Sequence, residues 1–243
     1  MRTFASALGF VLAVSAGGAF AADNALTPKE KADGWVLLFD GKTLNGWTSA
    51  TTPGGGRRGG ADAKGGAPKK GRGAPDPGAA AQVGSNPKVC STPMGQAETP
   101  AGASHWEVVD RMIEPCGDPA GYLTTTANYK DFVLDVDFRT GADTNSGVFL
   151  RTGYEVQIWY KQPAGYNTGS IVGTGLTDKQ YDFVADQWNH FELTADGDHL
   201  IVVLNGVKTL DVHDSKFADG SIRLQYQKFP IEFKNFKLKP ITH

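Results

Sequence analysis

The chain contains 243 residues, of which 40% are hydrophobic and 10% aromatic, and its 24 basic and 26 acidic residues give a formal net charge of −2. A nucleic-acid-binding protein needs a net basic face to displace counterions from phosphate, so the balanced charge argues against that class. The hydrophobic content also excludes a chain that is disordered throughout, and the length suits a single all-β sandwich domain.

The first 21 residues have the pattern of a secretory signal peptide. Arg2 precedes the apolar stretch 8–14, and Ala19 and Ala21 occupy the two positions that a signal peptidase reads. We expect cleavage after Ala21, which leaves residues 22–243 as an exported domain, periplasmic or secreted. An uncleaved anchor is the alternative, although the apolar stretch is too short to span a bilayer.

The next predicted element is a helix start at residues 27–31. Thr27 is placed as the N-cap, Pro28 lies in the first turn and Glu30 occupies the capping-box position. Helical periodicity is otherwise nearly absent.

Residues 53–104 form a low-complexity insertion rich in glycine, alanine and proline, with seven Lys or Arg residues against three Asp or Glu residues. Burial cannot offset the entropy of ordering such a segment, so we expect a long, mobile insertion. Its basic clusters, Arg57–Arg58 and 69–72, could contact an anionic polysaccharide or membrane surface. A solvated linker without a partner explains the same composition.

The chain has two cysteines, Cys90 at the end of the insertion and Cys116 in the next ordered stretch. Export to an oxidising compartment predicts a disulfide that joins the end of the insertion to the folded body. Two independent thiols are the alternative.

Most of the remaining chain has the period of β-strands. Residues 132–138 alternate between apolar and acidic in their second half, and Asn205-Gly206 lies between two apolar runs, the strongest local hairpin signal. Asp196-Gly197 marks a further tight turn. Strands are predicted at 35–39, 106–109, 112–114, 132–138, 147–151, 154–159, 188–195, 199–204, 207–212, 221–225 and 230–238. This pattern predicts an all-β fold of two packed antiparallel sheets.

Several motifs of fixed chemical meaning are missing from the sequence. No two of the five histidines are four residues apart, and there is no nucleophilic-serine, P-loop or dinucleotide motif. Residues 143–147 offer oxygen ligands but lack the rest of a calcium-binding loop, so a turn explains them better.

One polar constellation stands out. Phe149 and Arg151 are predicted on one face of a strand, with Glu155 and Gln157 on one face of the next. If Thr152-Gly153 closes a hairpin, Arg151, Glu155 and Gln157 converge on a surface that could orient hydroxyl groups and move a proton. The alternative is a structural Arg–Glu pair with Gln157 in a cross-strand ladder.

A series of blocks resembles one family. Residues 34–47 (GWVLLFDGKTLNGW) resemble the opening signature of the 3-keto-disaccharide hydrolase domains. The likeness continues in order through 106–110, 129–132, 145–151, 154–158, 188–189, 204–206, 220–225 and 231–236.

This resemblance implies a concanavalin A-like jelly-roll sandwich and action on glycosides whose C3 hydroxyl is oxidised to a ketone. Such chemistry needs one base and an electrophile near O3. Within the matched blocks we expect Glu155 to be the base and Arg151, or a bound divalent cation, to stabilise the oxyanion. Asn145, Gln157 and Gln225 would hold hydroxyl groups. No cofactor is otherwise expected, and the partner is a carbohydrate.

Two stretches depart from the family pattern. Trp159 and Tyr160 follow Ile158 where relatives often have an acidic or amide residue, and Tyr226-Gln227-Lys228 replaces a stretch that often contains histidine. Trp159 and Tyr160 could stack on pyranose faces, or pack within the sandwich. A non-catalytic carbohydrate-binding module on the same fold therefore remains the alternative function.

Overall fold

The computed structural model describes residues 22–51, 105–116, 121–141, 144–159, 166–177, 185–227 and 230–243. The predicted signal peptide, the insertion 53–104 with Cys90, and Tyr160 lie outside these residues. Cys116 is disulfide-bonded, and Cys90 is the only other cysteine in the sequence.

The described residues form one short helix and thirteen strands. The helix is α1 (Pro28–Ala32). The strands are β1 (Val36–Leu37), β2 (Trp47–Thr51), β3 (His105–Val109), β4 (Met112–Cys116), β5 (Gly121–Thr125), β6 (Phe132–Thr140), β7 (Asn145–Leu150), β8 (Tyr154–Trp159), β9 (Asn189–Asp196), β10 (His199–Leu204), β11 (Val207–His213), β12 (Arg223–Tyr226) and β13 (Ile231–Pro240).

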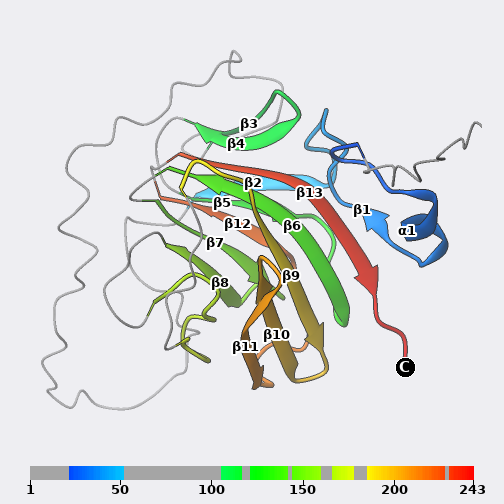
Figure 1. Cartoon of the computed structure of the whole chain (residues 1–243), viewed down its shortest axis with the longest axis vertical. Coiled ribbons are helices and arrows are strands. Elements are labelled where there is room, and N and C mark those ends of the chain that lie inside the picture. Colours follow the sequence, from blue (N-terminus) through cyan, green and yellow to red (C-terminus); the bar gives the residue numbers. More distant parts are fainter. Residues whose placement is uncertain are drawn as a thin grey trace, which may run out of the picture.

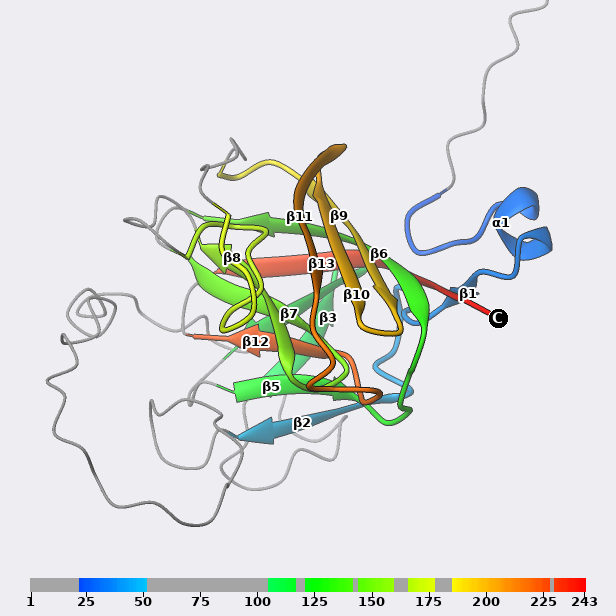
Figure 2. The same cartoon turned by 90° about the horizontal axis from the view of Figure 1, so that it is seen from below.

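These strands build two sheets that pack face to face as two layers (Figures 1 and 2). The larger sheet has the order β11-β10-β9-β6-β13-β4-β3, with β1 paired to β13, and the smaller has the order β2-β5-β12-β7-β8. Sequence neighbours such as β7 and β8 pair antiparallel, and so do distant strands such as β6 and β13. The predicted all-β jelly-roll sandwich of two antiparallel sheets is confirmed.

The core lies between the layers because each strand sends alternate side chains inward. On β6, Phe132, Leu134, Val136 and Phe138 are fully buried, and the acidic residues between them face outward. On the smaller sheet the inward side chains include Val148, Val156 and Leu224, all fully buried. One hydrophobic cluster therefore joins the two sheets.

The local turn and cap signals are confirmed. Thr27 accepts a hydrogen bond from the Glu30 amide at 3.1 Å, and the Glu30 carboxylate accepts one from the Thr27 amide at 2.6 Å, which completes the capping box. Asn205 and Gly206 have φ angles of 51° and 80° and close the β10–β11 hairpin.

Two strands were not predicted, and one is shorter than expected. β2 and β5 are rich in threonine and serine, and each shows little apolar alternation, so their period was too weak to detect. The strand expected at 35–39 pairs with β13 only at Val36 and Leu37.

The expected position of Arg151 is wrong. Arg151 is not on the strand face of Phe149, because it leaves β7 with a φ angle of 48° in the turn that leads to β8. Its side chain is fully buried, and its guanidinium donates to the carbonyl oxygens of Lys130 and Gly197 at 2.6 Å each. It also donates to the Phe217 carbonyl at 3.2 Å and to Asp131 Oδ1 at 2.9 Å.

These four contacts make Arg151 the centre of a structural hub, defined here as Arg151, Asp131 and the three carbonyls. The hub joins the β7–β8 turn to the segment before β6, the β9–β10 turn and the segment after β11. A fully buried guanidinium with every bond directed at protein oxygens cannot stabilise charge on a substrate. The catalytic role expected for Arg151 is therefore replaced by a structural one.

We predict that Arg151→Met lowers the free energy of unfolding by about 3 to 5 kcal/mol, because it removes a fully buried guanidinium that pairs with Asp131 and leaves three backbone carbonyls without this donor. Chemical denaturation of the purified protein measures this loss. Arg111→Met removes an exposed guanidinium and is the control, with an expected loss of about 1 kcal/mol or less. A loss below 1 kcal/mol for Arg151→Met would contradict the structural role.

Candidate functional site

The outer face of the smaller sheet carries most of the predicted site residues. Side chains on β5, β12, β7 and β8 that do not enter the core point to this face, and we call it the site face. It comprises Tyr122, Thr124, Arg223, Gln225, Asn145, Gly147, Phe149, Glu155, Gln157 and Trp159.

The strand register sets which of these residues are neighbours. Across β7 and β8, Phe149 lies opposite Glu155, Gly147 opposite Gln157, and Asn145 opposite Trp159. On the other side of β7, Phe149 lies opposite Arg223. Because directly opposite residues in an antiparallel pair point to the same face, these side chains form one continuous surface.

Glu155 extends across Gly147, which supplies no side chain. A methyl group at Gly147 would lie 3.1 Å from both Cγ and Oε1 of Glu155. The Glu155 carboxyl therefore rests over β7 and hydrogen-bonds with the Gln225 side chain on β12. The glycine is the feature that lets one side chain bridge three strands.

The position of Glu155 changes its acidity. Burial raises the pKa of the Glu155 carboxyl to about 7, and the hydrogen bond from Gln225 opposes that rise. A carboxyl group with a pKa near neutrality can both accept and return a proton at physiological pH.

Four polar atoms of the site face are buried without a hydrogen-bond partner among the described residues. They are Asn145 Oδ1, Gln157 Oε1, Gln225 Oε1 and Arg223 Nε. Buried polar groups are normally satisfied, so unsatisfied ones that cluster on one face mark a place for a polar ligand. Three of the four are acceptors, which match the hydroxyl donors of a sugar.

β8 is the last strand of the smaller sheet, and its outer edge hydrogen-bonds with the segment 167–177. The Gln157 amide donates to the Ser170 carbonyl at 2.9 Å, and the Gln157 carbonyl accepts from Gly169 at 3.0 Å. Thr168 Oγ1 donates to the Trp159 carbonyl at 3.1 Å. These contacts hold the edge that carries Glu155, Gln157 and Trp159.

The structure brings Asn145, Glu155, Gln157, Trp159 and Gln225 together on the site face, of which the strand pattern had placed Glu155 and Gln157 on a shared surface. Arg151 belongs to the hub, and Tyr160 lies outside the described residues. Sequence analysis missed Gly147 and Arg223. Arg223 precedes Gln225 by two residues, so the two-residue strand period could have placed it on the same face.

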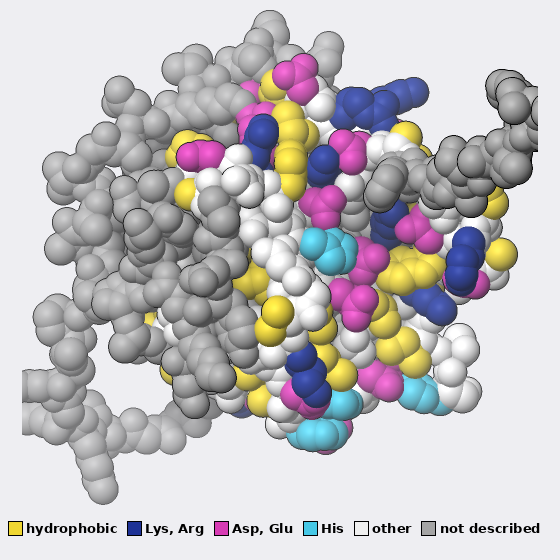
Figure 3. Space-filling view, in the orientation of Figure 1, with side chains coloured by type: hydrophobic (Ala, Val, Ile, Leu, Met, Phe, Trp, Pro, Cys, Tyr) yellow, Lys and Arg dark blue, Asp and Glu magenta, His cyan; other side chains and the backbone are white. Residues whose placement is uncertain are grey.

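The outer face of the larger sheet is different. Acidic, basic and histidine side chains are intermixed on the face seen in Figure 3. Several are already paired: Asp137 contacts His190 Nδ1 at 2.7 Å and Asn235 Nδ2 at 2.6 Å, and Lys237 donates to Glu30 at 2.6 Å. Such pairing is typical of a solvated face.

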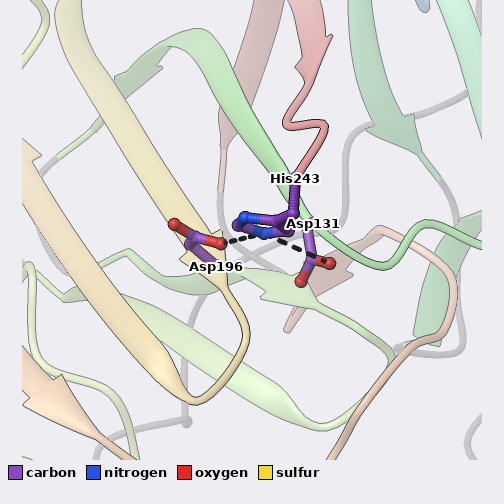
Figure 4. A group of neighbouring side chains, drawn as sticks. All are labelled: Asp131, Asp196 and His243. Atoms are coloured by element: carbon purple, nitrogen blue, oxygen red, sulfur yellow. Dashed lines mark ion pairs between the residues drawn. The ribbon is translucent and has the colours of Figure 1, made fainter.

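A group of three residues that could hold a metal ion, Asp131, Asp196 and His243, lies beside the hub (Figure 4). His243 Nε2 lies 2.8 Å from Asp196 Oδ1 and 3.9 Å from Asp131 Oδ2. Asp131 Oδ1 already accepts from Arg151 and from the Gly197 amide, each at 2.9 Å. Donation from Gly197, together with the charges of Lys130, Arg151 and His243, lowers the pKa of Asp131. We therefore interpret the group as an extension of the hub's ion pairs.

None of the helices within the described ranges has the length and apolar character needed to cross a bilayer.

Comparison with solved structures supports the fold. The chain is similar to a candidate glycosyl hydrolase from Parabacteroides distasonis, with a TM-score of 0.63 and 18% identity, over 91% of this chain and 100% of the other. A second such protein from the same organism gives a TM-score of 0.49 at 22% identity, over 56% of this chain and 90% of the other. At these identities the likeness concerns the fold alone.

Among curated proteins, none matches this chain in sequence. A family model described as the 3-keto-alpha-glucoside-1,2-lyase-like domain matches residues 34–239. That range includes every strand that contributes to the site face. The chain therefore belongs to the family of 3-keto-alpha-glucoside-1,2-lyase-like domains, and it is a carbohydrate-active protein with a jelly-roll fold.

Proposed function

We propose that this protein is an exported enzyme that cleaves 3-keto-glycosides by removing the C2 proton, eliminating the C1 substituent and hydrating the product. The observation that carries the proposal is the Glu155 carboxyl, which lies over Gly147 among unsatisfied amide oxygens with a pKa of about 7. Family membership supports the substrate class, and the signal-peptide pattern of residues 1–21 supports export.

The number of carboxyl groups favours elimination over ordinary glycoside hydrolysis. Ordinary glycosidases use two carboxyl groups on either side of the glycosidic bond. Among the described residues of the site face, Glu155 is the single carboxylic acid. One base is enough when a C3 ketone acidifies the C2 proton.

The proposed reaction has three steps. The ionised Glu155 takes the proton from C2, and the electron pair of the C–H bond forms an enediolate with C3 and its oxygen. The enediolate then reforms the C3 ketone, places a double bond between C1 and C2, and expels the C1 oxygen, which takes up a proton. Water adds across the C1–C2 double bond and restores a hydroxyl group at C1. Glu155 accepts the first proton and can return it to the leaving oxygen.

Asn145, Gln157 and Gln225 position the ring. Their unsatisfied amide oxygens can accept hydrogen bonds from sugar hydroxyls. Binding the sugar would then remove the free-energy cost of leaving these buried acceptors unpaired. Trp159, at the end of β8, presents an indole to the same face for stacking on a pyranose ring.

The oxygen atoms of the site face could also coordinate a divalent cation. One carboxylate and several amide oxygens suit a hard cation such as Mg²⁺ or Ca²⁺. Glu155, Gln157 and Gln225 would hold such an ion, which would supply a positive charge for the developing oxyanion.

A carbohydrate-binding module is the second candidate function. The predominance of amide acceptors on the site face favours it, because such groups bind hydroxyls without doing chemistry. Saturable binding of a 3-keto-disaccharide without release of the reducing sugar would support the module and exclude the enzyme.

We expect Glu155→Gln to lower kcat/KM for a 3-keto-disaccharide by roughly 100- to 10,000-fold, because the base is lost. For the wild type, kcat/KM should rise with pH and level off above about 7, as Glu155 ionises. Release of the reducing sugar, corrected for the uncatalysed reaction, gives both results. Unchanged release by Glu155→Gln would remove Glu155 from the mechanism.

The same variant should have a pH-dependent effect on stability. The pKa of Glu155 is higher in the folded protein, about 7, than the ordinary value of 4.5, so the folded state binds more protons between these values and stability falls as pH rises. Glu155→Gln should therefore unfold less readily than the wild type at pH 8, by on the order of 3 kcal/mol. Denaturation at pH 8 and pH 4 measures the difference, which should largely vanish at pH 4.

We predict that Gly147→Ala displaces the Glu155 side chain, since the added methyl would lie 3.1 Å from its Cγ and Oε1. The expected result is a fall in kcat of about 10- to 100-fold with a smaller change in KM, because a misplaced base affects the chemical step. Gly141→Ala is the control, since a methyl there meets no atom within 4 Å and Gly141, like Gly147, does not have a positive φ. Equal activity of Gly147→Ala and the wild type would contradict the role of the glycine.

A further inference from the structure

Arg223 differs from every other arginine in the described ranges. Arg111 donates to the Asp23 carbonyl, Arg139 pairs with Glu232, and Arg151 pairs with Asp131. Arg223 has neither an ion pair nor a hydrogen bond with the described residues, and its Nε is buried without a partner. A half-buried guanidinium without an anion is costly, so an anionic partner from outside the described residues would stabilise Arg223 on the site face.

An aromatic surface lies next to this guanidinium. Arg223 Cζ lies 5.8 Å from the centroid of the Tyr122 ring, which in turn packs edge-on against the Phe149 ring at 5.5 Å. These residues come from β12, β5 and β7, which are neighbours in the smaller sheet (Figure 2). A guanidinium that lies over an aromatic ring still has N–H donors free to bind two oxygens of one oxyanion.

This arrangement lies beside the Glu155 carboxyl but is distinct from it. Glu155 hydrogen-bonds with Gln225, not with Arg223. Arg223 and Gln225 are two residues apart on one strand face, a separation of about 7 Å, close to the length of one sugar ring. A ligand whose reacting ring contacts Glu155 would therefore place its next group over Tyr122 and Arg223.

We propose that Arg223, Tyr122 and Phe149 form a second subsite that binds an oxyanion, a carboxylate or a phosphate ester, on the group attached to C1 of the substrate. This inference rests on the proposed function for the position of the reacting ring. The aromatic rings support a flat or pyranose leaving group, and the guanidinium selects for negative charge.

The test compares glucosides that differ in one group. The probes are the unoxidised glucosides of 4-hydroxybenzoate, of its neutral analogue 4-hydroxybenzamide, and of 4-hydroxyphenyl phosphate. Calorimetric binding at low salt should favour each anionic probe over the amide by about tenfold, the effect of one charge-assisted hydrogen bond. The order of the two anions identifies the oxyanion that fits best.

Variants assign the preference to one residue. Arg223→Gln should reduce the preference to within about twofold, and Arg223→Lys should keep part of it, because the charge remains and the planar fork is lost. Arg139→Gln is the matched control, since Arg139 already pairs with Glu232 on the larger sheet, and it should leave the preference unchanged. Denaturation curves show that each variant is folded.

Equal affinity of the wild type for the anionic and neutral probes would overturn the subsite, and so would an anion preference that survives Arg223→Gln. The oxidised 3-keto form of the neutral probe separates this result from the reaction itself. If that probe is not cleaved while the anion preference persists, the proposed function fails and the subsite stands. If it is cleaved without any anion preference, the reverse holds.

Discussion

The hydrogen bonds of the buried Arg151 guanidinium hold the strands of the site in place. It lies in the turn between β7 and β8, and its bonds to Asp131 and to three backbone carbonyls tie that turn to three other segments of the sandwich. A buried charge is tolerated only when its partners satisfy it, so separating any of these segments would leave the guanidinium partly unsatisfied and destabilise the fold. The β7–β8 hairpin, which carries Glu155, is therefore anchored at its closed end.

The absence of a side chain at Gly147 determines where the Glu155 carboxyl lies. Gly147 leaves space for the Glu155 side chain, which crosses β7 and meets Gln225 on the neighbouring strand. The same crossing buries the carboxyl and brings its pKa to about 7, within the range where a side chain can both take and give a proton. Packing and acidity thus have one cause.

The two proposed functions share one requirement, since each needs the site face to bind a carbohydrate through its hydroxyl groups. In either proposal the amide oxygens of Asn145, Gln157 and Gln225, which are buried without a partner among the described residues, would accept those hydrogen bonds. Glu155 separates the two proposals, since only the enzyme requires its carboxyl group to act as a base. Arg223, which has no ion pair or hydrogen bond with the residues that the structure describes, extends the same surface toward β5 and adds a positive charge to it.

The sequence by itself determined the all-β class, the capping box at Thr27, the Asn205-Gly206 hairpin and the shared face of Glu155 and Gln157, because strand period and turn chemistry act between near neighbours. It could not find β2 and β5, whose small polar residues lack a clear period, or place Arg151, whose positive φ in a turn reverses the expected face. Only the tertiary structure decided that Arg151 is structural, that Gln225 meets Glu155 and that Arg223 has no ion pair within the described part of the chain. Those facts depend on contacts between strands far apart in the chain, and such contacts exist only once the two sheets have packed.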